Sequence, residues 1–299
     1  MSNPALKESD AIAELARVWR KYEGDPDGAI RAITETAARE LKVARASVWL
    51  LDEGAADLTC IDLYETEAHR HSGGTVLRAF DYPAYFAAML AEEAIAADDA
   101  HADRRTLEFS TSYLRPLGIG ALLDAPIRTG PRLVGVLCHE HIGPPRSWTA
   151  AERQDAAFLA SLASLTLELK SRARREALLA ATLESTGEGI LATDDTRVIA
   201  FNQRFVEMWQ IDAATMRSFE AVRRHIAARS RPAAAPAPAG DPVDTLELVD
   251  GRVFERTSRP QIVADRVVGR VWSFRDVTAQ RRAEALAEAA KRGGDGGDR

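Results

Sequence analysis

The densest group of potential ligand or catalytic side chains in the sequence is Cys138-His139-Glu140-His141. Thiolate, imidazole and carboxylate groups bind zinc, and the same groups serve as nucleophiles, acids and bases in enzymes. These residues follow the apolar run Leu133–Leu137, which predicts a strand, and strand side chains alternate between two faces. Cys138 and Glu140 then share one face, while His139 and His141 share the other. The four side chains therefore cannot converge on a single ion.

A metal site would need further ligands from elsewhere in the chain. Five of the six histidines fall between His69 and His141, and two residues of the strand together with His69 or His71 could reach one ion. Zinc sites more often have ligand pairs at closer spacing. We therefore expect no bound metal, and we expect these histidines to be exposed or to have ordinary polar partners.

The sequence contains none of the common phosphate-binding or nucleophile motifs. It has no Gly-x-Gly-x-x-Gly after a strand, no Walker loop and no Gly-x-Ser-x-Gly elbow. Gly293-Gly294-Asp295 shares three letters with the diguanylate-cyclase signature, but Gly296 stands where that signature has Glu. The 21 residues after Thr278 are too few for the phosphorylated helix and ATP lobe of a histidine kinase. We expect no enzymatic activity, unless the chain is the sensory portion of a longer kinase or cyclase.

The composition predicts a cytoplasmic protein of two domains. A length of 299 residues, with 46% apolar and 28% charged residues, is enough to build two cores. The formal net charge of −6 argues against nucleic-acid binding. Two cysteines and the lack of a secretory pattern indicate a reducing compartment. The longest uncharged stretch, Ala156–Leu167, is shorter than the about 20 apolar residues of a membrane span, so we expect no membrane partner.

The apolar period along the first half of the chain predicts one mixed domain. Residues 1–26 predict a helix with Ile12, Leu15, Trp19 and Tyr22 on one face, and a second helical pattern runs from Ala29 to Leu41. Strands and helices then alternate, which predicts an α+β domain over residues 27–170. The predicted strands are Ser47–Leu51, Leu58–Tyr64, Ala94–Ala97, Ala121–Ile127 and Leu133–His141, and the predicted helices are Tyr82–Leu90 and Leu107–Leu114.

A long helix is predicted from about Thr149 to Glu184, and its residues 150–184 connect the two domains. Thr149 and Glu152 have the spacing of a capping box, and no Gly or Pro follows before Thr186. The apolar seam repeats every 3.5 residues, which is typical of a two-stranded coiled coil. The seam consists of Phe158, Leu162, Leu165, Leu169, Leu179 and Leu183, interrupted by Arg172 and Glu176. A helix packed on its own domain is the alternative interpretation.

The second half predicts another mixed domain over residues 180–280. The Pro-rich run Pro232–Pro242 predicts an exposed loop. A last helix, Thr278–Arg292, begins an output segment and tail over residues 281–299, with the tail disordered from Gly293. The other predicted elements are strands Gly189–Asp194, Arg197–Phe201, Asp244–Val249, Arg252–Ser258 and Val267–Arg275, and helices Gln203–Trp209 and Thr215–Arg229.

Four segments of the first half are typical of one known family: Tyr82–Phe86, Asp98–Ala100, Tyr113–Ile119 and Gly135–His141. On these segments, residues 27–170 resemble a GAF domain of the kind found ahead of bacterial histidine kinases and diguanylate cyclases. The resemblance implies a small-ligand cavity between the sheet and the middle helices. The side chains placed there are Tyr82, Phe86, Phe109, Tyr113, Leu117, Cys138 and Glu140. The same aromatic residues would serve equally well as ordinary core.

Residues 180–280 resemble a PAS domain in the opening Ser185–Ile190 with Phe201-Asn202 and in the closing Phe274–Thr278. Five aromatic side chains are the pocket candidates, with core packing again the alternative: Phe201, Phe205, Trp209, Trp272 and Phe274. Asp276 or Thr278 can cap the helix that follows the last strand, so a change in the strand would alter the helix start. Such a cap is also a common structural feature without a signalling role.

The residues argue against the coloured cofactors of these two families. Cys138-His139 is similar to the bilin-attaching pair of phytochromes, but the family's proline- and aspartate-containing approach is absent, so we expect no bilin at Cys138. A haem-binding PAS domain needs an axial histidine, and the candidate His225 stands beside two arginines as on a solvated helix face. Both cysteines lie outside the second half, which excludes flavin photochemistry through a cysteine there. We expect no cofactor.

Together the two resemblances predict a bacterial sensor of a signal-transduction pathway such as a two-component system. The expected fold class is α+β, with two domains, each an antiparallel sheet flanked by helices, joined by the long helix. We expect a parallel homodimer through the residues of the seam, helped by the N-terminal helix. The expected partners are an unknown small-molecule ligand and a downstream kinase or response protein. A cofactor-bearing light, redox or gas receptor is the alternative.

Overall fold

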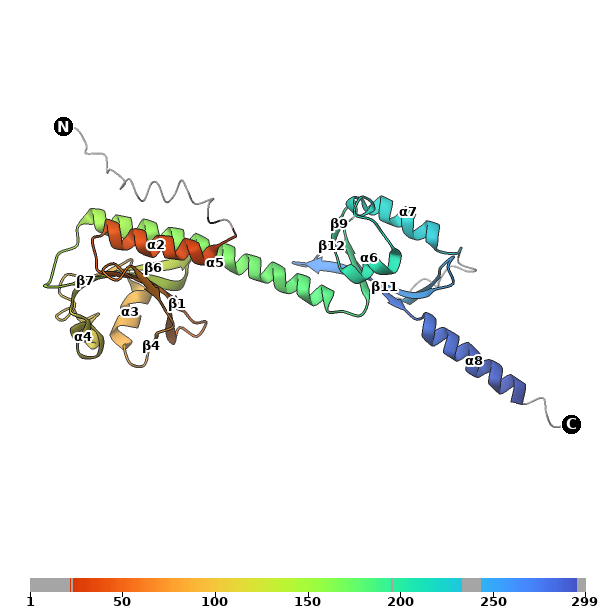
Figure 1. Cartoon of the computed structure of the whole chain (residues 1–299), viewed down its shortest axis with the longest axis horizontal. Helices are drawn as coiled ribbons and strands as arrows, with labels where there is room; N and C mark the ends of the chain where they lie inside the picture. The colour runs from red at the N-terminus through yellow and green to blue at the C-terminus, as the bar shows by residue number, and fades with distance from the viewer. Residues whose placement is uncertain (1–21, 23, 195, 233–242, 295–299) are drawn as a thin grey trace, which may run out of the picture. The chain divides into compact units, whose positions relative to one another are not determined.

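The computed structural model describes residues 22, 24–194, 196–232 and 243–294. The predicted N-terminal helix therefore lies outside the described residues, apart from Tyr22 and the residues from Gly24 onward, and most of the predicted Pro-rich loop and the end of the tail lie outside them as well. The chain divides into one unit that ends at Arg174 and another that begins at Arg175. The two units are described separately (Figure 1).

The first unit is built on an antiparallel sheet of seven described strands in the order β3-β2-β1-β7-β6-β5, with β4 pairing with β2. The short strands β3 and β4 fall in a stretch for which the sequence predicted no element. The strands are β1 (Arg45–Leu51), β2 (Asp57–Glu65), β3 (Arg70–Ser72), β4 (Val76–Arg78), β5 (Ile95–Ala97), β6 (Ile119–Thr129) and β7 (Arg132–Ile142).

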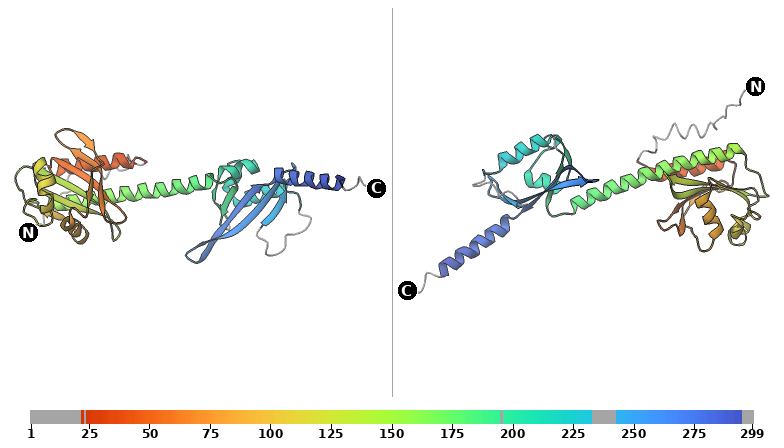
Figure 2. Two further views of the ribbon diagram at one scale, coloured as in Figure 1. Left: turned by 90° about the horizontal axis from the view of Figure 1, so that it is seen from below. Right: turned by 180° about the vertical axis from the view of Figure 1, so that it is seen from behind.

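Helices cover both faces of this sheet, so its central strands are buried on both sides. Helix α2 (Pro26–Glu40) and the first part of α5 (Ala150–Glu184) lie side by side on one face (Figures 1 and 2). Helix α3 (Pro83–Ala91) and an irregular helical run lie on the other face. The run consists of η2 (Leu107–Phe109), η3 (Ser110–Leu114) and α4 (Arg115–Leu117), where the sequence predicted one regular helix.

Helix α5 is continuous from Ala150 to Glu184, as the sequence predicted. The predicted capping box is confirmed, since Glu152 N donates to Thr149 Oγ1 at 3.2 Å and Thr149 N donates to Glu152 Oε2 at 2.8 Å. The side chains that α5 buries against the first unit are not the predicted seam. They are Ala156, Leu159, Ala160 and Ala163, which pack with the apolar face of α2.

The seam lies on a flank of α5 and is covered only at its beginning. Phe158 and Leu162 are partly buried against the first unit's core. Leu165, Leu169 and Leu179 are 43%, 51% and 67% exposed, and every residue from 171 to 182 is exposed. The alternative of packing within one domain therefore applies to a different face of the helix. In the second half of the seam Leu179 is exposed, whereas Leu183 is partly buried.

The second unit contains an antiparallel sheet of five described strands in the order β10-β11-β12-β8-β9. Its core, around Phe205, Trp209 and Phe254, packs beneath helices α6 and α7. Helix α8 ends at Gly294, two residues beyond the predicted end. The elements are β8 (Gly189–Thr193), β9 (Val198–Phe201), α6 (Gln203–Trp209), η4 (Thr215–Arg217), α7 (Phe219–Arg229), β10 (Val243–Glu247), β11 (Val253–Val263), β12 (Arg266–Asp276) and α8 (Thr278–Gly294).

Candidate functional site

The first candidate site is a small cavity in the first unit, between the sheet and the helices α3 and η3. Its volume is about 30 Å³. Its walls are apolar except for a few buried polar groups. The lining residues are Trp49, Leu58, Leu77, Tyr85, Phe109, Tyr113, Leu114, Leu122, Asp124, Val136, Cys138 and Glu140.

Asp124 is a buried carboxylate in the wall of this cavity. Strand β6 places it directly opposite Cys138 of β7, and Tyr85 of α3 donates a hydrogen bond to its Oδ2 at 2.6 Å. Its other oxygen, Oδ1, is buried and has no hydrogen-bond partner among the described residues. Burial raises the pKa of Asp124 to about 7, although the hydrogen bond from Tyr85 lowers this pKa in part. Asp124 is therefore a proton-binding group near neutral pH.

The second polar group of the cavity is Glu140, which forms an ion pair with Arg45, its neighbour across strands β1 and β7. Arg45 Nε donates to Glu140 Oε2 at 2.7 Å, and Tyr113 donates its hydroxyl to Glu140 Oε1 at 2.7 Å. Arg45 also pairs with Glu65 at 3.2 Å. Burial raises the pKa of Glu140, although Arg45 opposes this shift. The pair therefore ties together three strands and η3 at the edge of the cavity.

The thiols near the cavity are inert. Cys60 and Cys138 are both free and buried. Burial raises the pKa of Cys60 to about 12 and raises that of Cys138 well above its ordinary range. Because the thiolate is the reactive form, neither cysteine is prepared for nucleophilic or redox chemistry.

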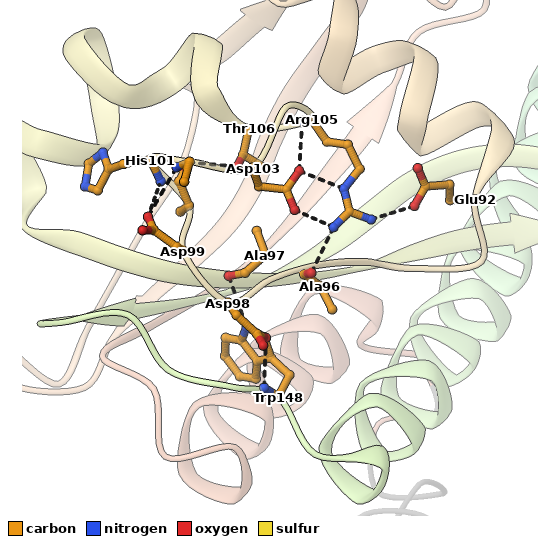
Figure 3. Close-up of polar contacts among 12 residues, drawn as sticks. Glu92, Ala96, Ala97, Asp98, Asp99, His101, Asp103, Arg105, Thr106 and Trp148 are labelled. Atoms are coloured by element: carbon orange, nitrogen blue, oxygen red, sulfur yellow. Dashed lines mark hydrogen bonds and ion pairs between the residues drawn. The ribbon is translucent and has the colours of Figure 1, made fainter.

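Arg105 holds the segment that leads into the cavity wall (Figure 3). Its guanidinium binds Asp103, donates to Glu92 Oε2 at 2.7 Å and donates to the Ala96 carbonyl at 2.9 Å. Asp99 accepts from the backbone N–H of His101 at 2.9 Å, and Asp98 accepts from the N–H of Trp148 at 3.1 Å (Figure 3). The Asp98–Ala100 segment thus fixes the loop between β5 and η2.

The structure brings four of the seven residues predicted for this cavity to its wall: Phe109, Tyr113, Cys138 and Glu140. Phe86 is buried in the surrounding core but does not line the cavity, because Tyr85, one position earlier and about 100° away around the helix, occupies that place. Tyr82 stacks on Phe109 with ring centroids 4.2 Å apart, outside the cavity. Leu117 packs against the core from α4.

Tyr85 and Asp124 are the functional groups that the sequence reasoning missed. Asp124 had a visible signal, because it is the one charged residue within the predicted apolar strand Ala121–Ile127. A charged residue in such a run indicates either that the predicted strand is misplaced or that the charged group is buried with a partner. Nothing in the sequence identified Tyr85 as that partner, since 39 positions separate the two residues.

The histidines have separate surroundings. His139 is buried, its Nδ1 bonds to the Leu123 carbonyl at 2.7 Å, and burial lowers its pKa to about 4. His71 lies between Asp62 and Glu35, and His101 bonds to Ser110. His225 is half-buried rather than solvated, and its Nε2 lies 2.9 Å from the Trp209 carbonyl oxygen. Across the described residues, no three His, Cys, Asp or Glu side chains are arranged to hold a metal ion.

The second unit contains a larger cavity between α7 and the inner face of its sheet, with a volume of about 380 Å³. Trp272 and Phe274 line it, as predicted from the sequence. Phe205 and Trp209 do not, because both are fully buried in the core on the α6 side. Phe201 is 42% exposed on strand β9 at the edge of the sheet and is not a pocket residue. These three aromatic residues therefore do not line this cavity.

The closing segment of the second unit connects its sheet to α8. Thr278 N donates to Asp276 Oδ1 at 3.0 Å, so Asp276 caps the first turn of the helix. Thr278 Oγ1 accepts from the backbone N–H of Val253 at 2.9 Å, and Val277 N donates to the Val253 carbonyl at 2.9 Å. The start of α8 is therefore bonded to the start of β11, and the predicted cap is confirmed.

Several solved structures are similar to the first unit. A protein in its far-red absorbing dark state with bound biliverdin IXa has 15% identity over 54% of this chain and 99% of that one, with a TM-score of 0.47. The GAF domain of an Acinetobacter phosphoenolpyruvate-protein phosphotransferase has 15% identity over 56% of this chain and 99% of that one, with a TM-score of 0.44. The blue-light absorbing form of the Thermosynechococcus elongatus PixJ GAF domain has 21% identity over 53% of this chain and 94% of that one, with a TM-score of 0.45. No curated protein matches the sequence.

The residues of this chain do not fit a bilin. The cavity of about 30 Å³ holds water but not a tetrapyrrole, since pockets for organic ligands are about 300–1,000 Å³. The thiol of Cys138 is buried and protonated rather than accessible at the surface.

The family comparison agrees with the two folds. Residues 25–167 match the GAF domain family, and residues 177–235 match a PAS domain family. No helix in the described parts of the chain is both long and apolar enough to cross a membrane. The chain therefore contains a GAF domain followed by a PAS domain, joined by the long helix α5.

Proposed function

We propose that this protein is a cytoplasmic signal-transduction sensor that binds a small molecule or partner and transmits its state through paired helices. The observation that carries the proposal is the link between cavity and helix in the PAS domain. Strand β12 lines the 380 Å³ cavity with Trp272 and Phe274, and it ends two residues before the first residue of α8. A displacement of β12 against β11 would alter the hydrogen bonds of Thr278 and so the start of α8.

The second half of the proposal is a parallel homodimer. Leu165, Leu169 and Leu179 are exposed on a continuous helix, at seam positions on either side of Arg172 and Glu176. Exposed leucines at a 3.5-residue repeat are the side chains with which one helix packs against a copy of itself. In such a dimer a ligand acts on the same helices in both chains, and a downstream kinase or response protein would read the α8 pair.

A spin label on α8 tests the transmission. Ala285 is exposed, and Cys60 and Cys138 are buried, so Ala285→Cys is labelled alone. In the labelled protein we expect a narrow distribution of distances between the spin labels of two copies. Thr278→Val removes the acceptor for the Val253 N–H and should broaden this distribution. Thr278→Ser keeps that acceptor and is the matched control. Labels without a measurable intermolecular distance, or a distribution unaffected by Thr278→Val, would contradict the proposal. An absorption band in the visible range would favour a cofactor-bearing receptor instead.

A further inference from the structure

We infer that the GAF domain contains a pH-sensitive switch, in which Asp124 keeps helix α3 on the sheet while it carries a proton and loosens α3 when it ionises. This inference rests on the proposed function, because it names the signal that the sensor would read, namely the concentration of protons. The contact between the two elements is the hydrogen bond that the Tyr85 hydroxyl donates to Asp124 Oδ2 at 2.6 Å.

Helix α3 is the movable side of this contact. Strand β6 is bonded to β7 and β5 on its two sides, whereas α3 packs on the sheet through its side chains. The ends of α3 are held by half-buried residues. Glu108 accepts from a backbone N–H of its first turn at 3.0 Å, and Arg128 donates to a carbonyl of its last turn at 3.2 Å. Between these ends, Asp124 acts on Tyr85, the one polar side chain of the helix.

The surroundings of Asp124 favour its neutral form. Its Oδ1 atom is buried without a hydrogen-bond partner among the described residues. A buried carboxylate loses its hydration, and this cost falls on the charged form alone. The hydrogen bond from Tyr85 reaches only Oδ2, so burial outweighs it and raises the pKa of Asp124 to about 7. The position of α3 in the structure thus suits protonated Asp124, and ionisation favours a position that lets water reach Oδ1.

Four titratable groups around Asp124 are uncharged near neutral pH. Burial raises the pKa values of the Tyr85 and Tyr113 hydroxyls and of the Cys138 thiol above their ordinary ranges. Burial also raises the pKa of Cys60 to about 12. Strand β5, which pairs with β6 beside Asp124, has no titratable side chain. None of these groups offsets a negative charge on Asp124.

The charged groups of this region give no compensation either. Glu140 of β7 is a second carboxylate and raises the pKa of Asp124 further. Arg45 of β1 forms ion pairs with Glu140 and Glu65. His139 is next to Glu140 in the chain, and burial lowers its pKa to about 4, so it is neutral as well. A proton on Asp124 is therefore the means by which this core avoids an uncompensated charge.

Strand β5 connects Asp124 to the start of α5. Ile95 of β5 is the partner of Asp124 across the sheet. Two residues later, the Ala97 carbonyl accepts from Trp148 Nε1 at 3.4 Å, and Asp98 accepts from the backbone N–H of Trp148 at 3.1 Å (Figure 3). The residue after Trp148 begins the capping box of α5. A shift of β6 and β5 on ionisation would therefore act on the first turn of α5.

Hydrogen exchange of the α3 backbone tests the switch. Mass spectrometry follows α3 peptides from pH 5 to pH 8 in the unaltered full chain and in Asp124→Asn, which stays neutral. The ratio of the two rates at each pH removes the intrinsic pH dependence of exchange. We expect this ratio to rise by up to about tenfold per pH unit below about pH 7 and to level off above it. A ratio that is the same at every pH would overturn the inference.

Low concentrations of urea separate the release of α3 from unfolding of the whole domain. A local opening exposes little surface, so α3 exchange at pH 7 should change little with urea below the unfolding transition. Exchange of the central strand β1 should accelerate with urea, because it requires global unfolding. If α3 has the same urea dependence as β1, ionisation of Asp124 only destabilises the whole domain and the switch is refuted.

Two variants locate the titrating group, each compared with the same variant carrying Asp124→Asn. Tyr85→Phe keeps the ring and removes the hydrogen bond that lowers the pKa of Asp124, so the ratio should level off at a higher pH. Glu108→Gln is the matched control, because it removes a carboxylate that also bonds to α3, and it should leave the pH profile unchanged. A shifted profile in Glu108→Gln with none in Tyr85→Phe would assign the titration to Glu108 and overturn the inference.

Infrared spectroscopy detects the proton itself. The difference between the spectra of the unaltered protein and of Asp124→Asn should contain the C=O stretch of a protonated carboxyl group at pH 6. This band should lose its intensity as the pH rises through about 7. Its absence at pH 6 would contradict the switch.

The spin-labelled Ala285→Cys protein separates this inference from the proposed function. If α3 exchange has the expected pH profile but the α8 distance distribution is the same at pH 5.5 and pH 8, the switch stands and the transmission fails. If Thr278→Val alters the distribution while α3 exchange keeps a constant ratio, the transmission stands and the switch fails.

Discussion

At the residue scale, the GAF domain contains two buried groups whose pKa values shift in opposite directions, that of Asp124 upward and that of His139 downward. Asp124 has a pKa of about 7 instead of 3.8, and His139 has one of about 4 instead of 6.5, both because burial opposes their charged forms. The folded state thus holds the proton of Asp124 more tightly than the unfolded chain and that of His139 less tightly. The stability that protonated Asp124 contributes is therefore lost as the pH rises from about 3.8 to about 7, whereas the stability that neutral His139 contributes is lost as the pH drops from about 6.5 to about 4.

Asp124→Asn should separate these opposing effects. The unaltered protein should lose stability between pH 4 and pH 7 as Asp124 ionises, and the variant, which lacks the carboxylate, should not. The free energy of unfolding of the variant minus that of the unaltered protein should therefore rise by up to about 1.4 kcal/mol per pH unit in this range. Urea unfolding at intervals of one pH unit measures this difference. Asp81→Asn, at an exposed position, should give a constant difference. A constant difference for Asp124→Asn would show that Asp124 ionises as an ordinary carboxylate.

The burial of both cysteines predicts that they do not react in the folded protein. Because burial raises the pKa of Cys60 to about 12 and that of Cys138 well above its ordinary range, almost no thiolate is present at pH 8. Iodoacetamide at that pH should modify neither cysteine in the native protein and both in urea, as counted by mass spectrometry. Rapid native modification of Cys138 would mean that the GAF cavity opens to solvent.

At the element scale, Arg45 determines how the strands of the GAF domain are held at the cavity. Its side chain is 10% exposed and that of Glu140 is 6% exposed, so the pair is buried. Removing one partner of a buried ion pair leaves the other charge uncompensated, which costs about 3–5 kcal/mol. Arg45→Met should therefore destabilise the GAF domain by about 3–5 kcal/mol in chemical unfolding.

The double variant Arg45→Met with Glu140→Met should recover most of this loss, because no charge is then left buried. Arg70 provides the matched control. It pairs with Glu65 at the surface with 66% of its side chain exposed, so Arg70→Met should cost about 0–1 kcal/mol. If the double variant is as unstable as Arg45→Met, packing of the arginine stem rather than charge burial is the cause.

At the scale of the whole molecule, the exposed seam of α5 predicts the assembly. Leu165→Glu with Leu169→Glu would place four like charges in the seam of a dimer. Each buried leucine contributes about 1.5–3 kcal/mol before ordering costs, so losing these contacts should separate the chains at micromolar concentration. Light scattering should report a folded monomer for the variant and a dimer for the unaltered protein. Leu178→Glu changes an exposed leucine outside the seam and should leave the dimer intact. An unaltered mass for the double variant would contradict the seam.

Local patterns in the sequence predicted the two-domain α+β class, the continuity of α5, its capping box, and the cap formed by Asp276 and Thr278. These features depend on neighbours within four residues or on a regular apolar period, and both are visible in a linear chain. That Cys138 and His139 lie on opposite faces of the sheet is predictable in the same way, because side chains alternate along any strand.

The tertiary structure alone decided which residues face each cavity and how much space they leave. Tyr85 rather than Phe86 meets Asp124 because the rotation of α3 depends on packing against β6 and β7, far away in the sequence. Packing between distant segments also places Phe205 and Trp209 in the core. It brings three arginines of α7 and β11 to one cavity, namely Arg223, Arg224 and Arg256. Cavity volume is the small space left after many side chains have packed, so no local pattern in the sequence specifies it.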